Sequence, residues 1–266
     1  MEGLIILGVA IALALVAGGI YRRRIARRRK EVAGKELTTA EEEILNRHIA
    51  CFRVLPGDVR DKLVPRMRVF LDEVGFEPCG GLSEVTDEMR LVVAAQACLL
   101  LVNSGYKDFG RLRSVLMYPG AYRAPDHKGG EDVRLGESWD YGSVVLGWDS
   151  VVGGGRNAED GQNLVLHEFA HQLDQADGSA DGLPRLKRMA DYRAWAEAFQ
   201  AAYERHCEDV NAGRRTGLDP YGATNPAEFF AVATETFFEK SRVMKRDYPD
   251  VYRELVTFYG LDPGDW

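Results

Sequence analysis

The sequence LVLHEFAHQLD, residues 164–174, constrains the fold more than any other stretch of the chain. Its many apolar positions predict a largely buried helix, yet the same helix carries two histidines and a glutamate. His167 and His171 are four residues apart, slightly more than one turn, so both imidazoles leave the same face about 6 Å apart. Two imidazoles at that spacing suit one Zn²⁺ bound at about 2.0–2.1 Å from each nitrogen.

Glu168 follows the first histidine directly and leaves the helix about 100° around its axis from His167. Its carboxylate can therefore reach a metal-bound water without binding the metal. It can take a proton as the water attacks a carbonyl and return the proton to the leaving amine. The alternative interpretation is a surface helix that contains two histidines by chance. The apolar surroundings count against that alternative and favour a hydrolytic zinc site with Glu168 as general base.

A catalytic zinc site needs a third protein ligand and one open position. Positions 174 and 177 are both aspartate, so the extended pattern that supplies a third histidine is absent. A glutamate from a later helix is the other common solution. The candidates are Glu197, Glu204, Glu208, Glu228, Glu235 and Glu239. Glu228 also fits a capping box behind Asn225, whereas Glu235, two turns further along the same face, suits a supporting role.

The N-terminal region differs from the rest of the chain. Gly3 to Tyr21 contains 19 residues without a charge, about 28 Å as a helix, which is enough to cross a bilayer core. The following segment, residues 22–30, carries seven positive charges, and the positive-inside rule places such a segment in the cytoplasm. A cleaved signal peptide is the competing interpretation, but its basic residues would precede the apolar run. We therefore expect one uncleaved helix in the inner (cytoplasmic) membrane, with the globular part in the cytoplasm.

This interpretation divides the chain into a transmembrane anchor at 1–21, a basic juxtamembrane segment and linker at 22–37, and a globular domain at 38–266. The first 30 residues carry a net charge of +6 and the remaining 236 carry −13, against −7 for the whole chain. An acidic globular part argues against nucleic acid as a partner, whereas the basic segment suits anionic lipids. The four scattered cysteines lack C-x-x-C spacing, which predicts reduced thiols.

The remaining patterns predict a mostly helical α+β protein with a small sheet. Besides the histidine helix, which Asp160 can cap, helices are expected over residues 38–54, 88–103, 186–207, 226–240 and 248–259, and strands over 112–118, 133–137 and 143–148. Pro65 predicts a kink, or two short helices, within residues 59–74. The triple glycine Gly153 to Gly155 is expected to form a flexible link, because it lacks the continuation of a phosphate-binding loop.

Two stretches resemble the Mlc titration factor A family of zinc metallopeptidases. They are WDSVVGGGRNAEDGQNLVLHEFAHQLDQADGSADGLP at 148–184 and YGATNPAEFFAVATETFF at 221–238. The resemblance covers roughly residues 40–262 and implies a zincin-like metallopeptidase fold. It also implies a regulatory link to a cytosolic transcription regulator. The tyrosine and glutamate of the second stretch are more distantly similar to the catalytic domain of anthrax lethal factor.

By this resemblance, His167, His171 and Glu228 would be the zinc ligands and Glu168 the general base. Tyr221, seven residues before Glu228, would stabilise the oxyanion of the tetrahedral intermediate. The function implied is a zinc-dependent peptidase that acts on peptide or protein substrates. The alternative is a metal-containing binding protein without catalysis that sequesters a transcription regulator. Glu168 discriminates against that alternative, because a purely structural metal site does not need an unliganded carboxylate.

Two further expectations concern the surroundings of the site. In zincin-like folds a strand before the histidine helix pairs with an extended peptide, and residues 143–148 are the expected strand. Metal-bound histidines usually donate their second ring nitrogen to a nearby acceptor. Asp174 or Asp177 could fill that role for His171, although helix capping or solvation would explain either aspartate equally well.

Overall fold

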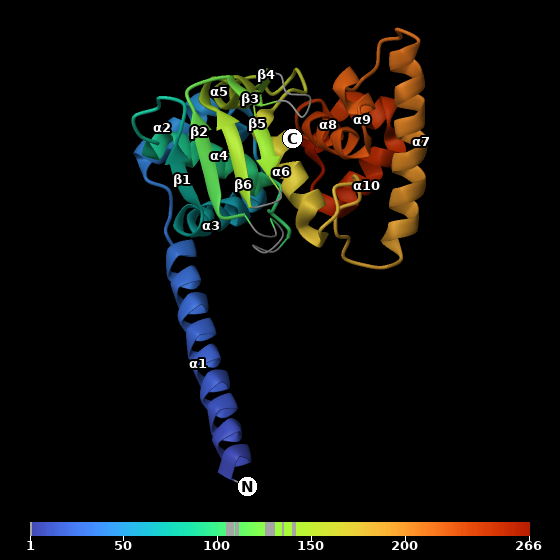
Figure 1. Ribbon diagram of the computed structural model, residues 1–266. Coiled ribbons are helices and arrows are strands. Elements are labelled where there is room, and N and C mark those ends of the chain that lie inside the picture. The colour runs from blue at the N-terminus through green and yellow to red at the C-terminus, as the bar shows by residue number, and fades with distance from the viewer. Residues whose placement is uncertain (1, 105–108, 110–111, 126–130, 135, 140–141) are drawn as a thin grey trace.

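A computed structural model describes residues 2–104, 109, 112–125, 131–134, 136–139 and 142–266, and the side chains of these residues except 2–10, 12, 122–125, 131–134 and 137–139. The chain is mostly helical with a small sheet, so the predicted α+β class is confirmed. Figure 1 shows the sheet with its neighbouring helices on one side of the body and the C-terminal helices on the other. The histidine helix lies between these two groups.

The α-helices are α1 (Glu2–Ala33), α2 (Thr39–His48), α3 (Gly57–Glu73), α4 (Asp87–Leu99), α5 (Trp148–Arg156), α6 (Leu164–Asp174), α7 (Asp191–Asn211), α8 (Pro226–Glu239), α9 (Ser241–Asp247) and α10 (Pro249–Tyr259). Each expected helix of the body is present, and α5 and α9 are helices that the sequence did not predict. Short 3₁₀ turns follow or precede the α-helices at η1 (Ala50–Arg53), η2 (Gln175–Asp177), η3 (Pro220–Ala223) and η4 (Pro263–Asp265). Thr38 forms a capping box at the start of α2, since its side chain accepts from the backbone N–H of Glu41 and its own backbone N–H donates to the Glu41 carboxylate.

The main sheet has four strands in the order β1 (Gly75–Pro78), β2 (Ser114–Tyr118), β6 (Ser143–Gly147) and β5 (Gly136–Trp139). The first three strands are parallel, and β5 pairs antiparallel with β6. The strand predicted at residues 143–148 is confirmed as β6, but its expected role of pairing with a peptide is wrong, because β2 and β5 flank it on both sides. Among the described strands, β5 forms the edge of the sheet next to α6.

A second, two-stranded sheet pairs β3 (Tyr122–Pro125) with β4 (Glu131–Arg134), in a region expected to be mostly loop. His127, expected to be exposed there, lies outside the described residues. The four cysteines are free thiols, as predicted.

The triple glycine is helical, which corrects the prediction of a flexible link. A Cβ on Gly155 would lie 2.6 Å from the backbone oxygen of His48, and one on Gly154 would lie 2.9 Å from the Cα of Asn163. Glycine is therefore required in α5 because neighbouring backbones approach it closely. The helix α3 is continuous through Pro65, so the alternative of two short helices is wrong.

The core holds α6 in a fixed place. Residues 91–99 of α4 are all buried, and Phe169 of α6 is fully buried. The Phe169 ring contacts the rings of Phe70 and Phe109 at centroid distances of 5.7 and 4.9 Å. Aromatic packing of this kind anchors the apolar face of α6 and leaves its histidine face toward α8.

The first helix projects away from the body, and its C-terminal end contacts α3 (Figure 1). Arg28 and Arg29 form ion pairs with Asp72 and Glu73 at 2.8 and 2.5 Å. Among the residues whose side chains are described, no helix is long and apolar enough to cross a membrane. The segment predicted to cross it, 1–21, includes side chains outside this description, so the anchor stays a prediction.

Candidate metal centre

The start of α6 is fixed by Asn163. Its side-chain oxygen accepts from the backbone N–H of Leu166 at 3.0 Å, which satisfies one of the free donors at the helix start. The expected cap, Asp160, instead accepts from the backbone N–H of Gln162 at 3.0 Å. The cap sets where α6 begins, and with it the direction in which both histidines leave the helix.

The structure brings the three predicted ligands together. Nε2 of His167 lies 3.0 Å from Oε2 of Glu228, and Nε2 of His171 lies 3.3 Å from the same oxygen. The two histidine Nε2 atoms are 3.2 Å apart. Glu228 reaches them from the first turn of α8, which packs on α6.

This triangle of atoms fits a zinc ion. Tetrahedral ligands at about 2.0–2.1 Å from Zn²⁺ are separated from one another by roughly 3.3 Å. The three distances above, 3.0 to 3.3 Å, match that separation. Two imidazole nitrogens and one carboxylate are also a common donor set of catalytic zinc. The site therefore has both the chemistry and the spacing to bind the ion.

Of the two roles that the sequence left open for the Glu228 carboxylate, the structure supports that of a ligand and shows no capping box at the start of α8 among the described contacts. The backbone N–H of Glu228 donates to the side chain of Asn225 at 2.9 Å, so the N-cap of α8 is formed. Its carboxylate, however, points toward the two histidines.

Glu235 supports His167 from the next turns of α8. Its Oε1 lies 2.7 Å from Nδ1 of His167, and its Oε2 accepts from the backbone N–H of Asn163. A carboxylate that accepts from the second nitrogen of a histidine fixes the ring and leaves the first nitrogen free for a metal. The sequence placed Glu235 on the correct face but gave no indication of Asn163, since its link to α8 depends on tertiary packing.

Charges in the cluster are strongly coupled. Burial lowers the pKa of His167, but its hydrogen bonds to Glu228 and Glu235 outweigh burial and hold that pKa well above the usual value. Burial raises the pKa of Glu228, but its hydrogen bonds to His167 and His171 lower it to about 2. The carboxylate is therefore anionic at neutral pH, as a metal ligand must be.

Glu168 lies beside β5, the edge strand of the sheet among the described residues. The residue is buried, and its Oε1 is 2.9 Å from the place that a Cβ on Gly136 would occupy. Gly136 is the first residue of β5. The proposed general base thus lies against the strand to which an extended peptide could pair.

Tyr221 stands next to the ligand cluster on η3. Its ring centroid is 6.0 Å from that of His167, and 54% of the residue is exposed. The Asp219 carboxylate holds this turn, because it accepts from the backbone N–H of Tyr221 at 2.8 Å and from the side chain of Gln162 at 3.0 Å. Nε2 of His206 lies 3.2 Å from the backbone oxygen of Asp219. These supports of the Tyr221 turn were not visible in the sequence.

The suggestion that Asp174 or Asp177 orients His171 is not supported. Asp174 is fully buried and accepts from the backbone N–H of Gly182 at 2.9 Å. Asp177 accepts from the backbone N–H of Ser179 at 3.0 Å. Both carboxylates therefore organise the loop that follows α6.

Comparison with known proteins identifies a metallo-peptidase family. Residues 23–260 match the model of the glucose-regulated metallo-peptidase M90 family. An uncharacterized protein of Synechocystis sp. is 37% identical over 271 residues, which cover 97% of this chain and 98% of that relative. The Mlc titration factor A of Pectobacterium atrosepticum is 31% identical over 222 residues, which cover 79% of this chain and 82% of the relative. That of Serratia proteamaculans is also 31% identical, with coverages of 78% and 83%.

The family match spans nearly the whole body of the protein, from the basic end of α1 to the end of α10. It includes α6 and α8, the two helices that supply the ligand triangle. The chain therefore belongs to the glucose-regulated metallo-peptidase M90 family, which includes relatives named Mlc titration factor A.

Proposed function

We propose that this protein is a zinc-dependent peptidase of zincin-like fold. His167, His171 and Glu228 would hold the ion. Zn²⁺ bound there would polarise a peptide carbonyl and lower the pKa of a bound water. The observation that carries the proposal is the position of Glu168, which is buried, interacts electrostatically with His167 and lies against β5, the edge strand among the described residues.

The edge strand supports a role in binding peptides. A substrate in extended conformation can add to β5 through backbone hydrogen bonds, which give affinity with little sequence preference. Such a substrate would run past Gly136, where the Glu168 carboxylate lies. Glu168 would take a proton from the attacking water and deliver it to the leaving amine. The Tyr221 hydroxyl would donate to the developing oxyanion.

Removal and return of zinc test this function. We expect the full-length protein to hydrolyse an unstructured peptide substrate, to lose this activity when a chelator removes the metal, and to regain it at one Zn²⁺ per chain. The measurement is peptide cleavage by mass spectrometry at each zinc ratio. Full cleavage by metal-free protein would rule out the proposed mechanism.

A second candidate function follows from the names of the relatives. Mlc titration factor A refers to the titration of Mlc, so a transcription regulator is a candidate partner of this chain as well. In that case the protein would sequester the regulator, and the metal site would be structural. The two functions differ at Glu168, since a pure binding protein should bind its partner equally well with and without that carboxylate.

The position of Gly136 gives a prediction specific to this structure. A Cβ there would lie 2.6 Å from Leu164 Cδ1, 2.9 Å from Glu168 Oε1 and 3.0 Å from the backbone oxygen of Val145. Gly136→Ala should therefore displace the Glu168 carboxylate and lower kcat by about tenfold or more, given that misplacement of a catalytic group by 1 Å can cost 10²-fold. Zinc content should not change.

Gly153→Ala is the matched control, because a Cβ at Gly153 meets nothing within 4 Å. Steady-state kinetics and metal analysis of both variants check the prediction. Equal kcat in the two variants would show that the place of Glu168 beside β5 does not matter for catalysis.

We also propose that α1 anchors the protein in the inner membrane, with the body in the cytoplasm. The helix is continuous from Glu2 to Ala33, and its side chains at Ile11, Leu13, Leu15, Val16 and Ile20 are 50–72% exposed. Exposed apolar side chains on a helix that leaves the body need a covering, and lipid would supply it. The Synechocystis relative matches 97% of the chain, so most of α1 lies within the matched region.

Membrane topology can be measured directly. Protease added to intact cells should leave the body, residues 38–266, uncut, whereas protease added after the inner membrane is opened should digest it. Recovery of the protein in the soluble fraction, or digestion in intact cells, would contradict the proposed anchor and orientation.

A further inference from the structure

A cavity of about 470 Å³ lies at the C-terminal end of α6. Its walls come from the end of α4, the end of α6, residues 185–188, the start of α7 and the face of α10. The volume falls within the range of small-molecule binding sites, roughly 300–1,000 Å³. None of the three metal-binding side chains lines it, so it is separate from the site described above.

One wall of the cavity is apolar and aromatic. Trp195 and Phe258 pack edge to face with ring centroids 5.4 Å apart, and Leu100 and Leu173 continue this wall. The Trp195 ring is held in place by its Nε1, which donates to the backbone oxygen of Gly182 at 3.2 Å. A rigid wall of this kind favours an apolar side chain or an aromatic ring.

The cavity also contains a buried carboxylate. Glu254 is 8% exposed and lines the wall from α10. Among the described residues, its ion-pair partner is Arg253, whose Nε lies 3.8 Å from Oε1, beyond hydrogen-bonding distance. Burial raises the pKa of Glu254 and Arg253 lowers it, with a net shift upward. A positive group bound in the cavity would compensate the charge of the Glu254 carboxylate, which Arg253 compensates only weakly.

The rim carries the opposite charge. Arg188 is paired with Asp191 at 2.5 Å, and the ammonium of Lys187 donates to the backbone oxygen of Asn103 at 3.2 Å. Arg185 also lines the cavity and makes no ion pair within the described part of the chain. The cavity thus offers an acceptor for a cation inside and a donor for an oxygen at the rim.

We propose that this cavity binds the N-terminal residue of a peptide with an apolar first side chain. The side chain would pack against Trp195 and Phe258, the α-ammonium would pair with Glu254, and Arg185 would be available to the first carbonyl oxygen. The proposal goes beyond the peptidase function and does not depend on zinc. Because Leu173 lines the cavity, a bound peptide would contact the same helix that carries His171.

The test uses the full-length protein and two small probes, L-phenylalaninamide and N-acetyl-L-phenylalaninamide. They share the ring and the carbonyl but differ in the α-amine, which is protonated at pH 6 in the first probe alone. We expect the unblocked probe to bind about tenfold or more tightly, as for a charge-assisted hydrogen bond. Ligand-observed NMR titration measures both affinities. Equal affinity of the two probes would overturn the proposal.

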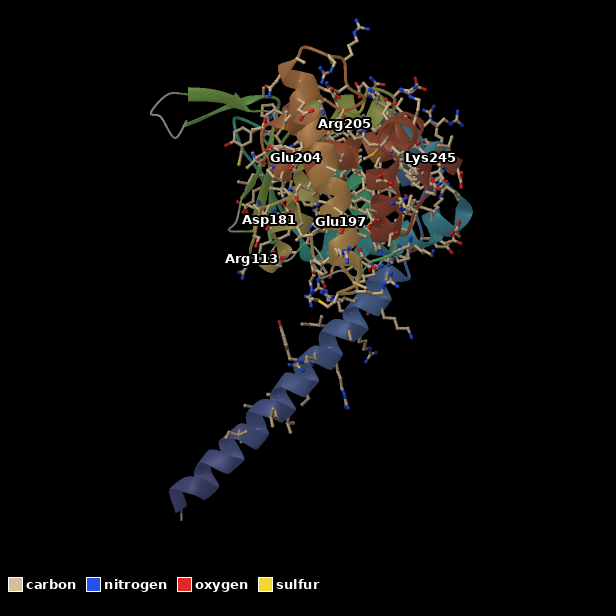
Figure 2. The ribbon with its side chains drawn as sticks, turned by 90° about the vertical axis from the view of Figure 1, so that its right-hand side faces the viewer. Arg113, Asp181, Glu197, Glu204, Arg205 and Lys245 are labelled. Carbon is tan, nitrogen blue, oxygen red and sulfur yellow. The ribbon has the colours of Figure 1, made fainter. Side chains whose placement is uncertain are left out.

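Two substitutions localise the binding. Glu254→Gln keeps the size of the side chain but removes its charge, so it should erase the difference between the probes. Glu204→Gln is the control, because Glu204 lies on the outward face of α7 (Figure 2). An unchanged difference in Glu254→Gln would place the binding elsewhere. Phenethylamine, which lacks the carbonyl, should bind more weakly than phenylalaninamide, and equal binding would reject the peptide N-terminus in favour of simple amines.

Discussion

Replacing Glu168 with glutamine is expected to lower kcat by about 10²–10⁴-fold while zinc stays bound. Positioned acid–base catalysis typically contributes this factor. The substitution keeps the size of the side chain but removes the group that accepts the proton. Because Glu168 is buried beside β5 and is not part of the ligand triangle, metal affinity should be nearly unchanged. Steady-state kinetics and zinc analysis of the same preparation measure both effects.

The same change at an exposed position provides the control. Glu204 lies on the surface of α7, where its carboxylate accepts a hydrogen bond from the side chain of Gln200. It is not one of the three candidate ligands, so Glu204→Gln should leave kcat unchanged. Undiminished hydrolysis by Glu168→Gln would show that another group acts as the base, or that the measured activity belongs to a different protein.

Glu228→Gln should cause a larger loss of bound zinc than Glu168→Gln or Glu235→Gln. The carboxylate lies 3.0 and 3.3 Å from the two histidine nitrogens and is the anionic member of the donor set. Glutamine retains the backbone N–H that donates to Asn225, so the N-cap of α8 should persist and the protein should stay folded. Zinc should fall below one ion per chain after dialysis, and peptide hydrolysis should fall with it.

Glu235→Gln is the comparison variant, because Glu235 contacts His167 and is not one of the three candidate ligands. Loss of an outer partner of a metal-bound histidine typically costs about 10–100-fold in affinity or activity. The effect on zinc affinity should therefore be smaller than that of Glu228→Gln. If Glu235→Gln removed the zinc and Glu228→Gln retained it, the ligand assignment would be wrong, and so would the role proposed for Tyr221.

Local patterns were sufficient to predict the two helices that carry the candidate ligands. Apolar periodicity and the four-residue spacing of His167 and His171 define the face of α6, and Asn225 with Pro226 marks the start of α8. The sequence also reduced the third ligand to a few glutamates. The family resemblance then singled out Glu228. The packing of α8 on α6, which short-range patterns do not contain, brings the Glu228 carboxylate to the two histidines.

The errors arose where contacts between distant segments decide local structure. Gly154 and Gly155 look like a flexible link in isolation, but close backbone approach makes them helical. The strand at the edge is β5 rather than β6, because residues 136–139 pair with β6 in antiparallel direction. Asn163, rather than Asp160, caps α6, and its backbone N–H also binds the Glu235 carboxylate.

The coordination of zinc in the full-length protein tests the central claim most directly. X-ray absorption at the zinc edge should show two imidazole nitrogens and oxygen ligands at about 2.0–2.2 Å, with no sulfur. The Glu228→Gln protein, if loaded with excess zinc, should have lost one of the oxygen ligands. A zinc–sulfur distance near 2.3 Å, or an identical spectrum in wild type and Glu228→Gln, would contradict a metal centre of His167, His171 and Glu228.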